Sequence, residues 1–344
     1  MTAWETPAGE PGIDRLRSRL TSFLGLSLPS EAPPATTLER IREEGYTRSL
    51  IRYVAPDGDE IPAFLFEPAA GGRRGAVLAL HQHNSQWELG KSEIAGLAGD
   101  PLQAFGPALA RAGVTVLAPD MVGFEARLQP VGAGAALAPP LHKRYSTAQG
   151  WLQHYNQMAH RLVQGDSLIN KLLVDAAVGL SVLQRANDVE PTRVGVAGHS
   201  HGGHVALFLA ALDVRVSFAC VSGATCSYRY KLANGLGLDM ALVIPGFARQ
   251  FDLADLIRCT APRKMFVVSS DDDPSASDAD DLVRDAASAF VAAGRPGHLQ
   301  HLRVPGPHSM DGRRFDAIVD WTQAEATRPL DGLTETVQPS SERS

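Results

Sequence analysis

The sequence predicts an α/β fold in which helices cover both faces of a mostly parallel sheet. Two observations predict it: apolar runs of strand length recur along the chain, and segments with apolar residues at helical spacing separate them. Strands that are apolar throughout are typical of parallel sheets buried on both faces. Two alternating runs near the N-terminus, separated by a Pro-Asp-Gly turn, add an antiparallel hairpin at one edge.

The elements are expected in the following order. Residues 1–45 form an N-terminal helical extension, with a helix at 13–24, where apolar residues recur at helical spacing, and a second helix near 38–44. The hairpin pairs 48–54 with 61–67. The buried strands that follow are expected at 76–80, 114–118, 194–197, 216–221, 265–268 and 299–304. The helical stripes between them fall at 102–109, 173–180 and 283–291.

Two long stretches interrupt this alternation, 121–164 and 224–256, and both contain scattered Gly, Pro and aromatic residues. Loops of this length inside a compact domain usually serve a function, so we expect them to form a lid or the walls of a pocket. The main domain then covers 46–327. The polar tail at 328–344 is expected to be disordered.

Composition excludes several classes of protein. The 344 residues carry 32 basic and 38 acidic side chains, a net charge of −6, which indicates no affinity for nucleic acid or an anionic membrane. No run of eighteen apolar residues is present to span a membrane, and the N-terminus has no signal-peptide pattern. Three cysteines are too few for a disulfide framework. We therefore expect a cytoplasmic protein with reduced thiols.

A catalytic serine is predicted at Ser200. The apolar strand at 194–197 runs into Gly-His-Ser-His-Gly at 198–202, and an apolar helical segment follows. This is the nucleophile-elbow pattern, Gly-x-Ser-x-Gly, in its strand–turn–helix setting. The glycines leave room where strand and helix crowd together, and the start of the helix directs backbone N–H groups at developing negative charge.

A serine needs a base to accept its proton, and the base needs an acid to orient it. The acid is expected after the next-to-last strand, where three aspartates follow Ser270. If the strand ends at Ser270 and two turn residues follow, the acid is Asp273. Asp272 is the alternative if the strand ends one residue earlier, and Asp271 is expected in the solvated turn. The base expected after the last strand is His308.

An oxyanion hole needs two N–H donors. The backbone N–H of His201, directly after the serine, is expected to be one of them. The second is expected from the loop after the strand at 76–80, from the N–H of His83 or Gln82.

A zinc site is the competing interpretation of this loop, because His81-x-His83 at a strand end places two imidazoles on one side. His199, His201 and His204 offer further ligands. The elbow pattern, however, already accounts for the serine and its glycines. We therefore expect no metal and no other cofactor, with the histidines shaping the pocket.

The chain resembles the α/β-hydrolase superfamily, in the branch that contains dienelactone hydrolase and the acetyl xylan esterase-like hydrolases. The resemblance covers about 46–325. Besides the elbow, the segments that carry it are His81-Gln-His-Asn84, Gly90-Lys-Ser-Glu93, Ala118-Pro-Asp120, Gly123-Phe124, Phe251-Asp-Leu-Ala-Asp255 and Ala261-Pro-Arg263. The sequence departs from the family's pattern at Ser270, where the family usually has glycine, and in the pair of histidines that flanks the serine.

The expected activity is serine-dependent hydrolysis of a carboxylic ester with a small or medium acyl group. A lactone, thioester or peptide substrate is an alternative, since the same triad serves all of them. A non-hydrolytic, ligand-binding member of the fold is a second alternative. Phe124, Trp151 and Tyr228 are expected to contact the substrate. The expected partners are a small-molecule ester and a second copy of the chain. The N-terminal helices are expected to form either a dimer contact or a lid.

Overall fold

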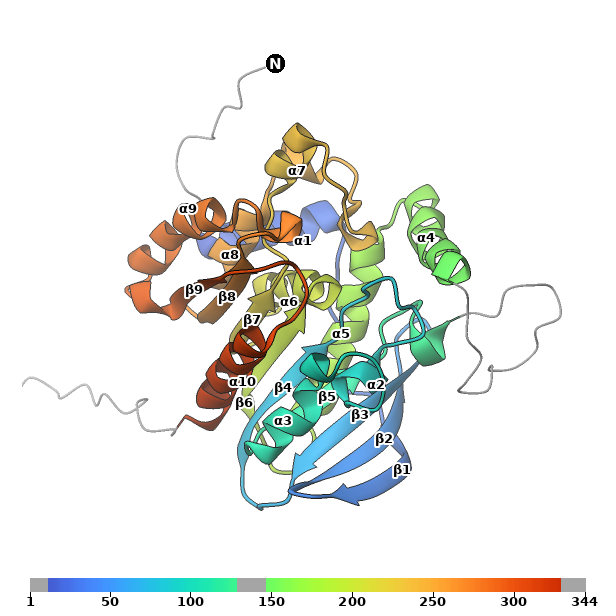
Figure 1. The fold of residues 1–344 in the computed structure, drawn as a ribbon. Helices are drawn as coiled ribbons and strands as arrows, with labels where there is room; N and C mark the ends of the chain where they lie inside the picture. The colour runs from blue at the N-terminus through green and yellow to red at the C-terminus, as the bar shows by residue number, and fades with distance from the viewer. Residues whose placement is uncertain (1–11, 129–146, 329–344) are drawn as a thin grey trace, which may run out of the picture.

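The computed structural model describes residues 12–128 and 147–328. Within them the chain forms one nine-stranded sheet in the order β1-β2-β3-β5-β4-β6-β7-β8-β9 (Figure 1). Strands β1, β2 and β3 are antiparallel, β3 joins β5 antiparallel, and the strands from β5 to β9 in that order run parallel. The strand bounds are β1 Thr36–Glu43, β2 Tyr46–Val54, β3 Glu60–Pro68, β4 Arg74–Leu80, β5 Thr115–Pro119, β6 Val189–His199, β7 Phe218–Ser222, β8 Lys264–Ser270 and β9 Leu299–Val304.

Helices cover both faces of this sheet. The helix bounds are α1 Ile13–Leu24, α2 Lys91–Ile94, α3 Phe105–Arg111, α4 Thr147–Val163, α5 Leu168–Gln184, α6 His201–Leu212, α7 Tyr228–Asn234, α8 Leu253–Thr260, α9 Ala279–Ala292 and α10 Gly312–Thr327. Helices α3 and α10 pack on one face and α5, α6 and α8 on the other, where α1 lies across α6 and α8 (Figure 1). Successive strand residues alternate between the two cores: Val77 belongs to one and Leu78 to the other.

The structure confirms the predicted α/β class, the hairpin and every predicted buried strand, with bounds shifted by a few residues. The helix predicted at 13–24 is α1, which buries Leu16, Leu20 and Leu24. This helix packs against α6 and α8. The division of the chain at residue 45 stays a prediction.

The helix predicted near 38–44 is wrong, because this segment is strand β1. Leu38 and Ile41 have helical spacing, but the segment pairs antiparallel with β2 through a tight turn at Gly45, whose φ is +86°. β1 is an edge strand whose side chains are mostly exposed, so the two-residue burial period that reveals a strand is missing. Its charged residues are typical of edge strands.

The two long stretches carry helices of their own. The described part of 121–164 contains α4, and residues 129–146 lie outside the described residues. The stretch 224–256 contains α7 and two short 3-10 helices, Met240–Leu242 and Phe247–Arg249. The expectation of a disordered tail also falls outside the described residues, beyond 328. No helix in the described ranges is both long and apolar enough to cross a membrane.

The parallel strands bring the chemically interesting loops together. The carboxyl ends of parallel strands meet at one edge of a sheet, which is where ligands bind in α/β proteins. The loops after β4, β6, β8 and β9 all leave from this edge, and each carries residues singled out by the sequence.

Candidate active site

Ser200 occupies a strained turn between β6 and α6. Its φ is +56° and its ψ is −120°, a conformation that a residue with a Cβ adopts only when its surroundings impose it. Its N–H donates to the carbonyl of Ser222 at 2.8 Å. A Cβ on Gly198 would lie 2.3 Å from the carbonyl oxygen of Gly202, and one on Gly202 would lie 2.1 Å from that of Leu80. The turn therefore requires both glycines.

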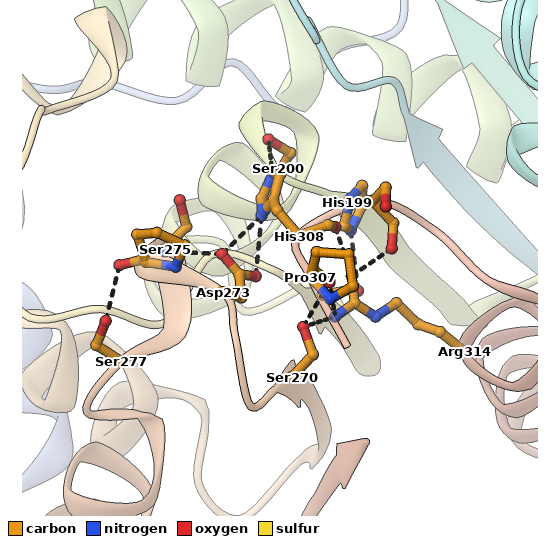
Figure 2. A network of polar contacts seen from close by, with 12 residues as sticks. His199, Ser200, Ser270, Asp273, Ser275, Ser277, Pro307, His308 and Arg314 are labelled. Atoms are coloured by element: carbon orange, nitrogen blue, oxygen red, sulfur yellow. Dashed lines mark hydrogen bonds and ion pairs between the residues drawn. The ribbon is translucent and has the colours of Figure 1, made fainter. Parts of the chain in front are cut away.

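The structure brings Ser200, His308 and Asp273 into one chain of hydrogen bonds (Figure 2). His308 Nε2 lies 2.8 Å from Ser200 Oγ, and His308 Nδ1 lies 2.9 Å from both carboxylate oxygens of Asp273. A carboxylate only accepts, so Nδ1–H donates to Asp273 and the lone pair of Nε2 accepts the Ser200 hydroxyl. In this tautomer His308 can take the proton of Ser200 as the serine attacks.

Asp273 is held ionised in a buried position. Its side chain is 0% exposed, and it also accepts the N–H of Ser275 at 2.7 Å. Burial by itself raises the pKa of Asp273, but the hydrogen bonds and charge of His308, with the Ser275 amide, outweigh it and hold the pKa below its usual value. The carboxylate is therefore negative at neutral pH, as an orienting acid must be.

The neighbouring aspartates point elsewhere. Strand β8 ends at Ser270, as the sequence predicted, and Asp271 and Asp272 form the exposed turn that follows. Asp271 forms an ion pair with Arg303 at 2.8 Å. The register that selects Asp273 over Asp272 is thus the one found in the structure.

Sequence reasoning missed Arg314, which fixes the loop of His308. This buried residue of α10 donates to the carbonyl of His308 at 2.6 Å and also contacts the hydroxyl of Ser270 (Figure 2). Ser270 in turn donates to the carbonyl of Pro307 at 2.8 Å. Ser270, at the position where the sequence departs from the family it resembles, therefore helps to hold the loop that carries His308. No local pattern reveals Arg314, because an arginine in a C-terminal amphipathic helix usually faces solvent.

The predicted oxyanion donors lie in adjoining turns. Leu80 at the end of β4 pairs with Gly198 of β6, so the loop carrying Gln82 and His83 leaves the sheet beside the serine turn. His201 is the first residue of α6, where a backbone N–H has no acceptor within the helix. The choice between Gln82 and His83 for the second donor stays a prediction.

Lys91 forms ion pairs with two carboxylates beside the loop after β4. The buried ammonium of Lys91 lies 2.7 Å from Asp120 and 2.5 Å from Glu125. Burial alone lowers the pKa of Lys91, but the two carboxylates outweigh it and raise the pKa above its usual value. The segment Gly90-Lys-Ser-Glu93 thus ties the loop after β4 to the loop after β5.

The three residues predicted to contact substrate take different positions. Phe124 is fully buried. Trp151, on α4, is 50% exposed and stacks on Tyr155 with ring centroids 5.3 Å apart. Tyr228 is buried in the apolar core, and its hydroxyl donates to the carbonyl of Leu242 at 2.8 Å. Packing and this hydrogen bond account for the position of Tyr228, and substrate contact by Phe124, Trp151 and Tyr228 stays a prediction.

A second group of polar side chains surrounds Asp239, and sequence reasoning missed this carboxylate. His201 Nδ1 lies 3.0 and 3.1 Å from its two oxygens, His83 Nε2 3.6 Å and His204 Nδ1 3.9 Å. The ring of His154, from α4, packs on that of His201 with centroids 5.4 Å apart. We refer to these five residues as the Asp239 cluster.

Burial lowers the pKa of three histidines of this cluster. Burial lowers the pKa of His154 and of His204 to about 3 each, and that of His83 to about 4. Burial raises the pKa of Asp239, but the histidines, His201 foremost, outweigh it and hold the pKa well below its usual value. A single buried carboxylate thus faces several imidazoles.

Comparison with known proteins places this architecture. No protein-family model matches the chain. The protein described as "Putative hydrolase YtaP" of Bacillus subtilis (strain 168) is 29% identical over 255 residues, which cover 72% of this chain and 77% of that protein. A "putative acetyl xylan esterase" of Bacteroides fragilis NCTC 9343 superposes with a TM-score of 0.67 at 16% identity, over 85% of this chain and 74% of the other. The chain has the α/β-hydrolase fold.

A second solved structure shares this fold. A glucuronoyl esterase from Solibacter usitatus matches with a TM-score of 0.63 at 14% identity, over 90% of this chain and 92% of the other. In the α/β-hydrolase fold the nucleophile, acid and base follow in that chain order, which is the order of Ser200, Asp273 and His308.

Proposed function

We propose that the chain is a serine hydrolase that cleaves a carboxylic ester with a small or medium acyl group. The observation that carries the proposal is the hydrogen-bond chain from Ser200 through His308 to Asp273, built on a strained turn at the start of α6. A residue held in such a conformation needs a reason for the strain, and exposing a nucleophile beside its base is that reason.

The proposed cycle has two halves. In the first, Ser200 Oγ attacks the ester carbonyl and passes its proton to His308 Nε2, and the imidazolium is stabilised by Asp273. The N–H of His201 and that of Gln82 or His83 stabilise the oxyanion, and collapse of the intermediate releases the alcohol with the proton from His308. In the second half water, deprotonated by His308, attacks the acyl-enzyme and releases the acid. No cofactor takes part in these steps.

An ester is favoured over a lactone, thioester or peptide because the solved structures that share the fold are named as esterases. A ligand-binding protein without activity is the other candidate, but it would not need an acid and a base aligned on a strained serine. We also propose a small-molecule substrate and a cytoplasmic location. The three cysteines are free and buried, which fits a reducing compartment.

The test is a panel of p-nitrophenyl esters of increasing acyl length, measured beside a lactone and a thioester. We expect hydrolysis of at least the short esters, and loss of about 10⁴-fold or more in kcat for Ser200→Ala. Ser277→Ala, which removes an exposed hydroxyl near Asp273, is the matched control and should keep kcat within about twofold. Ester hydrolysis by Ser200→Ala at the rate of the unaltered protein contradicts the proposal.

A further inference from the structure

Three residues of the Asp239 cluster converge from separate segments of the chain. His154 comes from the middle of α4, His201 from the first position of α6, and Asp239 from the residue before the 3-10 helix Met240–Leu242. One ligand atom from each residue lies within 4.8 Å of the other two. His154 and His201 are buried, and the Asp239 side chain is nearly so.

Polar atoms in this group lack a partner. Among the described residues, neither ring nitrogen of His154 makes a hydrogen bond, and neither does Nε2 of His201. Both ring nitrogens of His204 lack a hydrogen-bond partner as well, but His204 is not part of the group of three whose ligand atoms lie within 4.8 Å of one another. Aromatic rings enclose His154 instead: Trp87 lies 5.0 Å and Phe124 5.1 Å away between centroids. Buried imidazole nitrogens are almost always bonded, so both nitrogens of a buried histidine without a partner point to a ligand.

We propose that His154, His201 through Nδ1 and one oxygen of Asp239 bind a divalent transition-metal ion of the zinc class. Two imidazoles and a carboxylate form a zinc donor set, and a fourth position is left for solvent or His83. Two ligands bound tetrahedrally at about 2.1 Å lie roughly 3.4 Å apart. The existing separations of 3.0 and 3.1 Å between His201 Nδ1 and Asp239 therefore need little change. The ligand atoms of the group lie within 4.8 Å of one another, so His154 needs to approach by at most about 1.4 Å.

This donor set differs from the histidine-only zinc site that is the competing interpretation of the sequence, and it departs from the expectation that the chain holds no metal. His81 Nε2 accepts the N–H of Met121 at 3.0 Å, and its Nδ1 donates to the carbonyl of Gln82 at 2.8 Å. Both ring nitrogens of His81 are thus occupied. His199 uses Nδ1 on the hydroxyl of Ser222 at 3.0 Å. The ligands come instead from the two long stretches, through His154 and Asp239.

The proposed site shares no side chain with Ser200, His308 and Asp273, but it includes His201, whose backbone N–H is a proposed oxyanion donor. The ion would join α4 to the start of α6 and to the stretch that contains Asp239. It would therefore fix the position of α4, with its exposed Trp151, relative to the serine turn. Binding of the ion, and not turnover, is the property to measure.

The experiment uses the full-length protein, stripped of metal by dialysis against a chelator. Zn²⁺ is titrated by calorimetry with a competing chelator, and Co²⁺ by its visible absorption, which reports tetrahedral coordination. We expect one ion per chain, a raised Tm with Zn²⁺, and no binding of Mg²⁺ or Ca²⁺, which prefer oxygen ligands. Failure of the unaltered protein to bind Zn²⁺ overturns the proposal while leaving the proposed hydrolase untouched.

Variants test the ligands. Asp239→Asn and His154→Ala should each weaken Zn²⁺ binding by at least about 100-fold, because even residues that only orient a ligand cost 10- to 100-fold when lost. His204→Asn is the matched control, since it removes a buried histidine next to Asp239 that is outside the donor set, and should cost less than about tenfold. Circular dichroism checks that each variant folds, and Ser200→Ala should bind Zn²⁺ as the unaltered protein does. Loss of binding in His204→Asn but not in His154→Ala contradicts the donor set.

Discussion

The two polar groups beside the serine turn differ in how completely their hydrogen bonds are made. In the group of Ser200, His308 and Asp273, both ring nitrogens of the histidine and both carboxylate oxygens have partners. In the Asp239 cluster, neither His154 nor His204 has a hydrogen-bond partner for either ring nitrogen among residues 12–128 and 147–328. Leaving a buried polar group unbonded costs about 1–3 kcal/mol. The group of Ser200 thus finds all of these hydrogen-bond partners within the protein, whereas the Asp239 cluster needs a ligand to supply the missing ones.

The difference follows from where the residues come from. The first group sits on the loops after β6, β8 and β9 of one sheet, and a buried arginine fixes the loop after β9. The second group depends on α4 and on the stretch 224–256, which are additions to the sheet. A preorganised arrangement suits acid–base chemistry, whereas side chains brought in by added segments suit an ion that pulls them together.

The largest effect is expected from removing the carboxylate of the Ser200 group. Asp273→Asn should lower kcat by about 10⁴-fold, because the amide cannot hold His308 in the required tautomer. Asp271→Asn changes an exposed carboxylate of the same turn and should stay within a few-fold. Steady-state kinetics on one ester decides the matter. If Asp272→Asn proves the damaging change and Asp273→Asn is nearly silent, the first group is not the complete one.

An intermediate effect is expected from the support of His308. Arg314→Met removes the donors to the carbonyl of His308 and to the Ser270 hydroxyl, so the loop loses its fixed position. A misplacement of about 1 Å can cost 10²-fold, so we expect kcat to fall by about that factor with a much smaller change in KM. The neighbouring Arg313 is exposed, and Arg313→Met should leave both parameters unchanged. If Arg314→Met leaves kcat unchanged, as Arg313→Met is expected to do, the fixed position of this loop is unimportant for catalysis.

The smallest effect is expected from removing metal. The proposed reaction cycle uses no ion, and the side chains of the two groups are separate, so chelation should lower kcat by less than about threefold. The measurement compares the stripped protein with the same sample after Zn²⁺ is restored. A complete loss of activity that Zn²⁺ reverses would contradict the separation of the two groups, because both would then belong to one catalytic centre.

Much of the fold could be predicted because its signals are local. The apolar strands, the serine turn with its glycines, and the register that selects Asp273 all depend on short stretches of sequence. Strand β1 could not be predicted because its side chains are exposed on both faces, so Leu38 and Ile41 gave the only pattern, and it was helical.

In the candidate site, only the residues that follow a fixed order along the chain could be predicted. Ser200, Asp273 and His308 follow a fixed order on the α/β-hydrolase fold, so each could be selected without coordinates. Arg314 and Asp239 act through contacts between residues far apart in the chain, and nothing in their neighbours along the sequence marks them. The path of the two long stretches depends on how they pack against the sheet. The spacing of apolar residues in the sequence does not predict that packing.

The central claim is that His308 and Asp273 activate Ser200, and labelling with a fluorophosphonate tests it most directly. The activated oxygen attacks phosphorus as it would a carbonyl, so the unaltered protein should gain one adduct, which peptide mass spectrometry should locate on Ser200. Ser200→Ala should gain none, and Asp273→Asn should react far more slowly. An adduct that persists in Ser200→Ala, or one that forms on another residue of the unaltered protein, would contradict the account.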